Sequence, residues 1–187
     1  MGRPIVLISD EPYRKIVFDG LEAPSLFPFY EHTIVVTSHS KDLGLAAERV
    51  GYVALSPRIA DAALLADALI LANRILGFVN APALMQHAVR SLQHITVDVS
   101  EYQRKRDFLF GHLTGIGYAV VKPQGAFYMF PQSPVEDEMV VVEALQRHGV
   151  LVVPGRGFGM PGYFRISYCV GQRVLEGALE GFRAVQG

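Results

Sequence analysis

The fold prediction rests on the stretch Thr33-Ile34-Val35-Val36-Thr37-Ser38-His39-Ser40-Lys41. Its β-branched first half predicts a buried strand over residues 33–37, because a short continuous apolar run is typical of such a strand. Lys41 follows the end of that strand, where desolvation disfavours the charged form of an amine. A neutral amine is the form that attacks a carbonyl carbon. The stretch therefore indicates a nucleophilic lysine just beyond a buried strand.

Hydroxyl groups and a cation accompany this lysine in the sequence. Ser38 and Ser40 precede it, and Arg49 follows two helical turns later. These groups suit a phosphate, which binds several donors and a fixed cation. A simpler interpretation is that the serines form a turn and that Lys41 faces water. This stretch alone leaves both interpretations open.

A second apolar run, Pro4 to Ser9, ends in Asp10 and is followed by Tyr13. An aspartate at the carboxyl end of a buried strand stands where open α/β sheets place ligand groups. An acidic group there can keep the nitrogen of a pyridine ring protonated. The phenol of Tyr13 can donate a hydrogen bond to a ring oxygen or accept one from it. The two runs together therefore predict a ligand site with a carboxylate, a phenol and an amine.

The order and local spacing of these groups resemble the class I aminotransferases of the aspartate aminotransferase fold. The matching pattern is Asp10-x-x-Tyr13, then Ser38-x-x-Lys41, then Arg49. The resemblance implies pyridoxal 5′-phosphate (PLP) as the cofactor. It also implies that Lys41 is the catalytic lysine, which holds PLP as a Schiff base and later moves a proton.

The same resemblance assigns the remaining cofactor contacts. Asp10 is implied as the partner of the pyridinium nitrogen, and Tyr13 as the partner of the ring hydroxyl. The implied phosphate ligands are Ser38, Arg49 and, as a weaker candidate, Ser40. For Ser40 a turn-forming role is an equally good account.

The resemblance continues toward the C-terminus. It covers the segment Gln124-Gly125-Ala126-Phe127-Tyr128 and the segment from Val153 to Ser167. Arg165 is then the residue expected to bind the substrate's α-carboxylate, which a guanidinium fork matches with two parallel hydrogen bonds. The alternative for Arg165 is an edge-strand arginine that faces water. Arg156, which is flanked by glycines, is expected to face solvent.

The resemblance implies an α/β fold in which only the C-terminal half of the family's chain is present. Residues 1–97 would be a remnant of the PLP-binding large domain, with a mixed or parallel sheet and helices. Residues 98–187 would form a small α+β domain with the order β-β-α-β-β-α.

Residues 59–76 form the longest apolar stretch, with Leu and Ala at helical spacing. A helix this apolar is expected to be buried or to lie at an interface. Three charged residues make a membrane span a poor interpretation, because a span needs about 20 nearly uninterrupted apolar residues.

Composition limits the partners. The chain has 187 residues, half of them apolar, and a formal charge of −1. Such a balance predicts neither nucleic acid nor a membrane surface as a partner, and no metal site is predicted. A single cysteine, Cys169, suits a reducing compartment, so a cytoplasmic location is expected.

The implied reaction is transamination between an amino acid and a 2-oxo acid, of the aspartate or aromatic type. Two alternatives stay open: a PLP-dependent C–S lyase on the same scaffold, and a catalytically silent fragment or interaction module. A half-length chain is expected to be weak or inactive alone. It is also expected to form a homodimer or to associate with a complementary N-terminal half.

Overall fold

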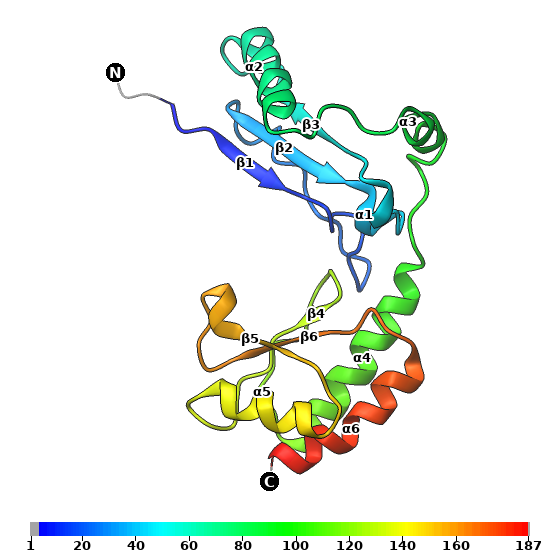
Figure 1. Cartoon of the computed structure of the whole chain (residues 1–187), viewed down its shortest axis with the longest axis vertical. Helices are drawn as coiled ribbons and strands as arrows, with labels where there is room; N and C mark the ends of the chain where they lie inside the picture. Colours follow the sequence, from blue (N-terminus) through cyan, green and yellow to red (C-terminus); the bar gives the residue numbers. More distant parts are fainter. Residues whose placement is uncertain (1–3, 187) are drawn as a thin grey trace. The chain divides into compact units, whose positions relative to one another are not determined.

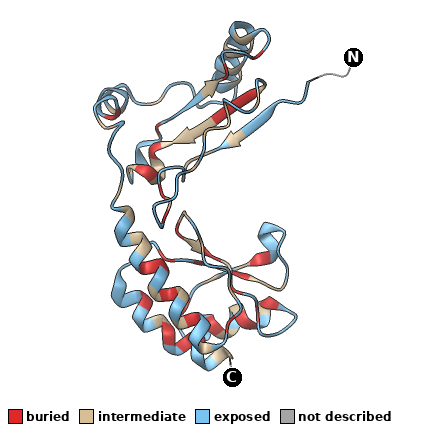
Figure 2. Ribbon diagram, turned by 180° about the vertical axis from the view of Figure 1, so that it is seen from behind, coloured by how far each residue is buried: buried red, intermediate tan, exposed pale blue. Residues whose placement is uncertain are grey.

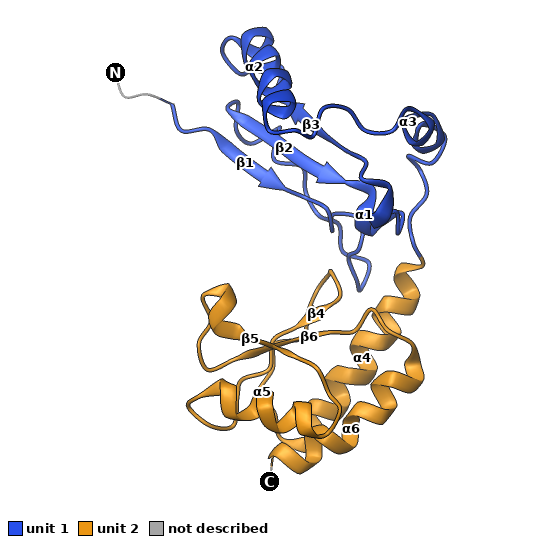
Figure 3. Cartoon of the chain, in the orientation of Figure 1, with its two compact units in different colours: residues 1–97 blue, residues 98–187 orange. Residues whose placement is uncertain are grey.

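A computed structural model describes residues 4–186. The chain divides into two compact units, residues 1–97 and residues 98–187 (Figure 3). Each unit has its own sheet and its own helices, so each is described by itself.

The first unit contains a mixed three-stranded sheet. Its strands are β1 (Leu7–Asp10), β2 (Thr33–Ser38) and β3 (Gly51–Leu55), in the order β1-β2-β3 (Figure 1). β1 runs parallel to β2, whereas β3 runs antiparallel to it. The first three residues of β2 are buried. The predicted strand over residues 33–37 is thus confirmed, and its β-branched side chains fill a pleated, covered surface as expected.

The register of β1 and β2 decides where the polar residues meet. Asp10 pairs with Val36, so both strands end at the same edge of the sheet. The short helix α1 (His39–Asp42) begins directly after β2, and a 3₁₀ turn, η1 (Ala46–Glu48), follows it. The segment that carries Lys41 therefore starts where β1 and β2 both end.

Two further helices complete this unit: α2 (Ala62–Ile75) and α3 (Ala83–Arg90). Of the two alternatives expected for this helix, burial within the chain is not seen, because every residue of α2 is at least partly exposed (Figure 2). Leu64 is 70% exposed and Ile75 is 76% exposed. The remaining expectation, an interface helix, stays a prediction. Within residues 4–186, no helix is both long and apolar enough to cross a membrane.

The second unit packs three helices with a small antiparallel sheet. The helices are α4 (Val99–Ile116), α5 (Glu138–Arg147) and α6 (Gln172–Gln186). The strands are β4 (Tyr128–Met129), β5 (Val153–Pro154) and β6 (Phe164–Ser167), in the order β4-β6-β5. A 3₁₀ turn, η2 (Gly155–Phe158), follows β5. Of the predicted order β-β-α-β-β-α, the first strand, expected at residues 118–121, is present only as an isolated bridge between Val120 and Pro131.

The core of the second unit lies along the inner sides of its helices (Figure 2). Leu109 and Leu113 of α4 are fully buried. Tyr118, just after α4, makes edge contacts with the rings of Phe164 and Phe182, and its hydroxyl donates to the Phe182 carbonyl at 2.9 Å. Burial raises the pKa of Tyr118 to about 12. This phenol therefore stays neutral and ties α6 to the end of α4.

Among the described glycines of the second unit, Gly155 leaves the least space for a side chain. A Cβ at this position would lie 2.2 Å from the Met160 carbonyl oxygen and 2.6 Å from that of Tyr163. Both atoms belong to the backbone, so they cannot rotate away. Gly157 lies in the same 3₁₀ turn, and a Cβ there would meet nothing within 4 Å.

We expect Gly155→Ala to lower the free energy of unfolding by about 1–3 kcal/mol, because overpacking forces the backbone to shift. Gly157→Ala, the matched control, should change it by less than about 1 kcal/mol. Urea unfolding of the full chain measures both. Equal losses in the two variants would contradict the contact geometry.

Candidate functional site

The predicted catalytic lysine and the predicted ring partners lie at the carboxyl edge of the first sheet. Asp10 is the last residue of β1, and Tyr13 lies in the turn that follows. Lys41 is on α1, and its Nζ lies 5.9 Å from the centroid of the Tyr13 ring. The backbone N–H of Glu11 donates to the Val36 carbonyl at 2.8 Å, which continues the strand pairing beyond Asp10. The fold thus brings two distant segments together at this edge.

The predicted phosphate ligands share one depression. Ser38, Ser40 and Arg49 line a hollow of about 1160 Å³ between α2 and the sheet. Arg49 has a left-handed backbone conformation, with a φ of 53°. One of its guanidinium nitrogens donates to the Ala46 carbonyl at 2.8 Å. Asp10, Tyr13 and Lys41 lie outside the lining of this hollow.

Neighbouring charges hold the helix that carries Lys41. The buried Asp42 lies 3.3 Å from the Nδ1 atom of His39 and 3.4 Å from the Nζ of Lys15. Its backbone carbonyl accepts from the N–H of Val97 at 2.8 Å. α1 has only four residues, which is far too short to be stable alone. Asp42 therefore fixes α1 through a contact within the helix and through contacts with two other segments, at Lys15 and Val97.

Sequence reasoning did not find this role of Asp42. The i,i+3 spacing of His39 and Asp42 is a local signal that could have suggested their contact. Lys15 and Val97 are too distant in sequence for any spacing rule to connect them to Asp42.

The predicted carboxylate ligand lies in the second unit. Arg165 is on β6, which is the central strand of its sheet, so the alternative of an edge-strand arginine is wrong. The guanidinium carbon lies 4.4 Å from the centroid of the Tyr128 ring and 4.1 Å from that of the Phe158 ring. Its Nε is buried and has no hydrogen-bond acceptor among residues 4–186.

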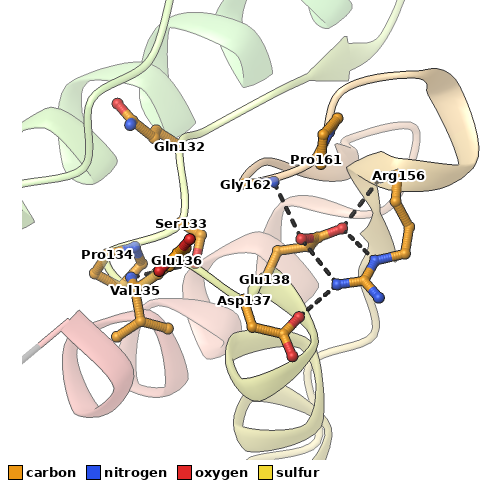
Figure 4. A pocket seen from close by; sticks show the side chains of 10 residues that line it. All are labelled: Gln132, Ser133, Pro134, Val135, Glu136, Asp137, Glu138, Arg156, Pro161 and Gly162. Carbon is orange, nitrogen blue, oxygen red and sulfur yellow. Dashed lines mark hydrogen bonds and ion pairs between the residues drawn. The ribbon is translucent and has the colours of Figure 1, made fainter.

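Arg156 is exposed, as expected, but it also has partners within the chain. Its Nε donates to Oε1 of the buried Glu138 at 2.7 Å, and its guanidinium also bonds to Asp137 (Figure 4). Glu138 accepts further bonds from the N–H groups of Arg156 and Gly162, at 3.2 and 3.1 Å. Asp137, Glu138 and Arg156 line a surface pocket of about 700 Å³. The two partners lie 18 residues apart, so no local pattern predicts the pair.

These hydrogen bonds shift the pKa values of Glu138 and Arg156. The Arg156 guanidinium, followed by the Gly162 N–H, lowers the pKa of Glu138 from 4.5 to about 2. The same bond with Glu138 raises the pKa of Arg156. The pair is therefore fully charged at neutral pH and connects α5 to η2.

We expect this pair to make the stability of the chain acid-dependent. Because the folded-state pKa of Glu138 is depressed, its contribution is complete above pH 4.5 and is lost as the pH falls toward 2. Glu138→Gln should flatten this part of the stability profile. Urea unfolding from pH 2 to 7 measures the effect. Glu136→Gln, at an exposed position of the same pocket, is the control and should leave the profile unchanged.

Across residues 4–186, no group of three or more histidine, cysteine, aspartate or glutamate side chains is arranged to hold a metal ion. The candidate residues offer hydrogen-bonding and charged groups: an amine, a phenol, carboxylates, hydroxyls and guanidinium groups.

The sequence of the chain matches a known protein family. Residues 2–182 match the model of aminotransferases of class I and II, and the chain belongs to that family. It is 32% identical over 186 residues to the aspartate/prephenate aminotransferase of Thermus thermophilus, covering 97% of this chain and 48% of that protein. It is 31% identical over 194 residues to the aromatic-amino-acid aminotransferase 2 of Thermococcus litoralis, covering 97% and 49%.

Solved structures agree with the sequence comparison. The crystal structure of an amino transferase from Eubacterium rectale superposes with a TM-score of 0.94 at 42% identity, over 98% of this chain and 46% of that one. A tetra mutant of Thermus thermophilus aspartate aminotransferase in complex with tryptophan gives a TM-score of 0.81 at 28% identity, over 96% of this chain and 48% of that one. The α/β units thus match part of the aminotransferase fold, and the chain spans about half the length of the relatives it matches.

Proposed function

We propose that this chain is the C-terminal part of a PLP-dependent aminotransferase that acts on an amino acid and a 2-oxo acid. The observation that carries the proposal is the convergence of Asp10, Tyr13 and Lys41 at one edge of the first sheet. Residues 1–97 would belong to the PLP-binding domain, and residues 98–187 to the small domain. Relatives named for aspartate, prephenate and aromatic amino acids support a substrate of the aspartate or aromatic type.

The donor set fits the cofactor. The Asp10 carboxylate would hold the protonated ring nitrogen, and the Tyr13 phenol would bind the ring hydroxyl. A phosphate dianion matches the hydroxyl and guanidinium donors that share the hollow beside α2: Ser38, Ser40 and Arg49. When bound, PLP supplies an electron sink for the substrate's α-carbon.

The chain's own residues would do the rest. Lys41 lies within reach of the Tyr13 ring, and its Nζ would take the proton from the α-carbon as a general base. Asp42 keeps α1 in place, so the backbone position from which the Lys41 side chain extends would be fixed. Arg165, in the second unit, would bind the α-carboxylate of the substrate with its guanidinium fork.

Covalent labelling tests the assignment of Lys41. Borohydride treatment in the presence of PLP should attach the cofactor irreversibly to the peptide that contains Lys41, as mass spectrometry of the digest would show. In Lys41→Arg the label should disappear without moving elsewhere. Equal labelling of the other lysines (Lys15, Lys105 and Lys122) would contradict a formed cofactor site.

We further propose that the exposed side of α2 is covered by another chain, either a second copy or a complementary N-terminal half, in a cytoplasmic protein. Leu64, Leu71 and Ile75 are 70%, 60% and 76% exposed, and all lie on this one helix. Contiguous apolar surface of this kind marks an interaction site. Because the chain spans about half the length of its relatives, we propose weak or absent transamination by the chain alone.

Ile75→Glu should therefore shift the chain from a dimer or larger assembly toward a monomer, because it places a charge in the covered surface. Light scattering after gel filtration measures the change. Val174→Glu is the matched control: Val174 is 60% exposed on α6, and its replacement should not change the mass. A wild-type chain that is already a clean monomer, and that transaminates alone, would contradict both parts of this proposal.

A further inference from the structure

Arg165 has an unusual set of neighbours for a partly buried cation. Its guanidinium carbon lies over both the Tyr128 ring and the Phe158 ring, 4.4 and 4.1 Å from their centroids. Both distances are well inside the range of about 6 Å in which a ring face attracts a cation. Its buried Nε has no acceptor among residues 4–186. The side chain is thus held by aromatic rings, while hydrogen-bonding capacity in its own plane is left unused.

Both rings are fixed by the fold. Tyr128 lies on β4, where it pairs with Ser167 of β6, and its ring contacts that of Phe127 at 5.0 Å. Phe158 ends η2, and its ring makes an edge contact with Phe130 at 5.7 Å. The start of η2 is tied to α5 through the Arg156 N–H, which donates to Glu138 at 3.2 Å.

We propose that Tyr128 and Phe158 form an aromatic clamp that sets the plane of the Arg165 guanidinium and thereby determines the affinity for a planar carboxylate. They are positioning residues, because they act on the ligand through Arg165. This inference rests on the proposed function, in which Arg165 binds the carboxylate of an amino acid or a 2-oxo acid.

The physical reason is preorganisation. An arginine side chain carries about 2 kcal/mol of rotamer entropy, and binding normally has to remove part of it. The clamp removes this freedom before the ligand arrives. Both rings contact the guanidinium without accepting its N–H groups, so these donors stay available to a carboxylate, which can accept two parallel hydrogen bonds.

Nuclear magnetic resonance of the full chain tests the clamp directly. In protein labelled with ¹⁵N-arginine, the Nε–Hε signal of Arg165 should be displaced upfield by the ring currents, and titration with 2-oxoglutarate should shift it further. Phe158→Leu and Tyr128→Leu should each remove part of the upfield displacement and weaken 2-oxoglutarate binding about three- to tenfold. Phe158→Tyr and Tyr128→Phe keep a ring and should retain both properties within twofold.

Two controls separate the clamp from a general loss of structure. The Nε–Hε signal of Arg156 reports the Glu138 pair, and it should stay in place in every variant. Phe110→Leu removes a ring on α4 that lies against Lys122 rather than Arg165, so it should leave the Arg165 signal and the affinity unchanged.

The outcomes distinguish this inference from the proposed function. If Arg165→Leu weakens 2-oxoglutarate binding but both leucine variants of the rings bind within twofold of wild type, the clamp is overturned and the substrate role of Arg165 stands. If Arg165→Leu binds 2-oxoglutarate as tightly as wild type, or if the wild-type signal does not respond to this ligand, the substrate role fails and the clamp's function fails with it.

Discussion

The parallel pairing of β1 with β2 is the constraint on which the candidate cofactor site depends. Asp10 and Ser38 are separated by a long irregular connection, yet the register that sets Asp10 opposite Val36 brings both strand ends to one edge. Parallel strands need such a connection, because no tight turn can join them. Tyr13 and α1 both follow from this edge, so a slip of the register would separate the phenol from the amine. Since β2 is buried at its start, its alternation of faces resists a slip.

In the second unit the corresponding constraint is electrostatic. Glu138 accepts hydrogen bonds from both the side chain and the backbone of Arg156, and also from the Gly162 N–H, so one buried carboxylate holds two points of the loop before β6. That loop includes Phe158 and is further restricted by the close backbone approach at Gly155. A buried carboxylate would be unfavourable without these donors. With them, it fixes the segment from which one face of Arg165 is covered.

The sequence predicted the elements with strong local signals and missed those that depend on distant partners. The β-branched run at 33–37 and the helix within 59–76 were found because their periodicity is local. For α2 the sequence left burial and an interface open, because apolar composition indicates that a face will be covered but not by which chain. The same distinction between local and distant signals holds for the functional residues. Lys41 and its neighbours could be proposed from spacing, whereas the pair of Glu138 with Arg156 joins segments that only the fold brings together.

Arg156 and Arg165 of the second unit have opposite electrostatic surroundings. Arg156 is neutralised within the chain by Glu138 and Asp137, which leaves it little attraction for a ligand. Arg165 has aromatic faces rather than carboxylates as its neighbours, so its charge is stabilised without being neutralised. Under the proposed function, an incoming carboxylate would therefore gain more from Arg165 than from Arg156, although Arg156 is the more exposed of the two. Selectivity between the two cations thus follows from what already surrounds each of them.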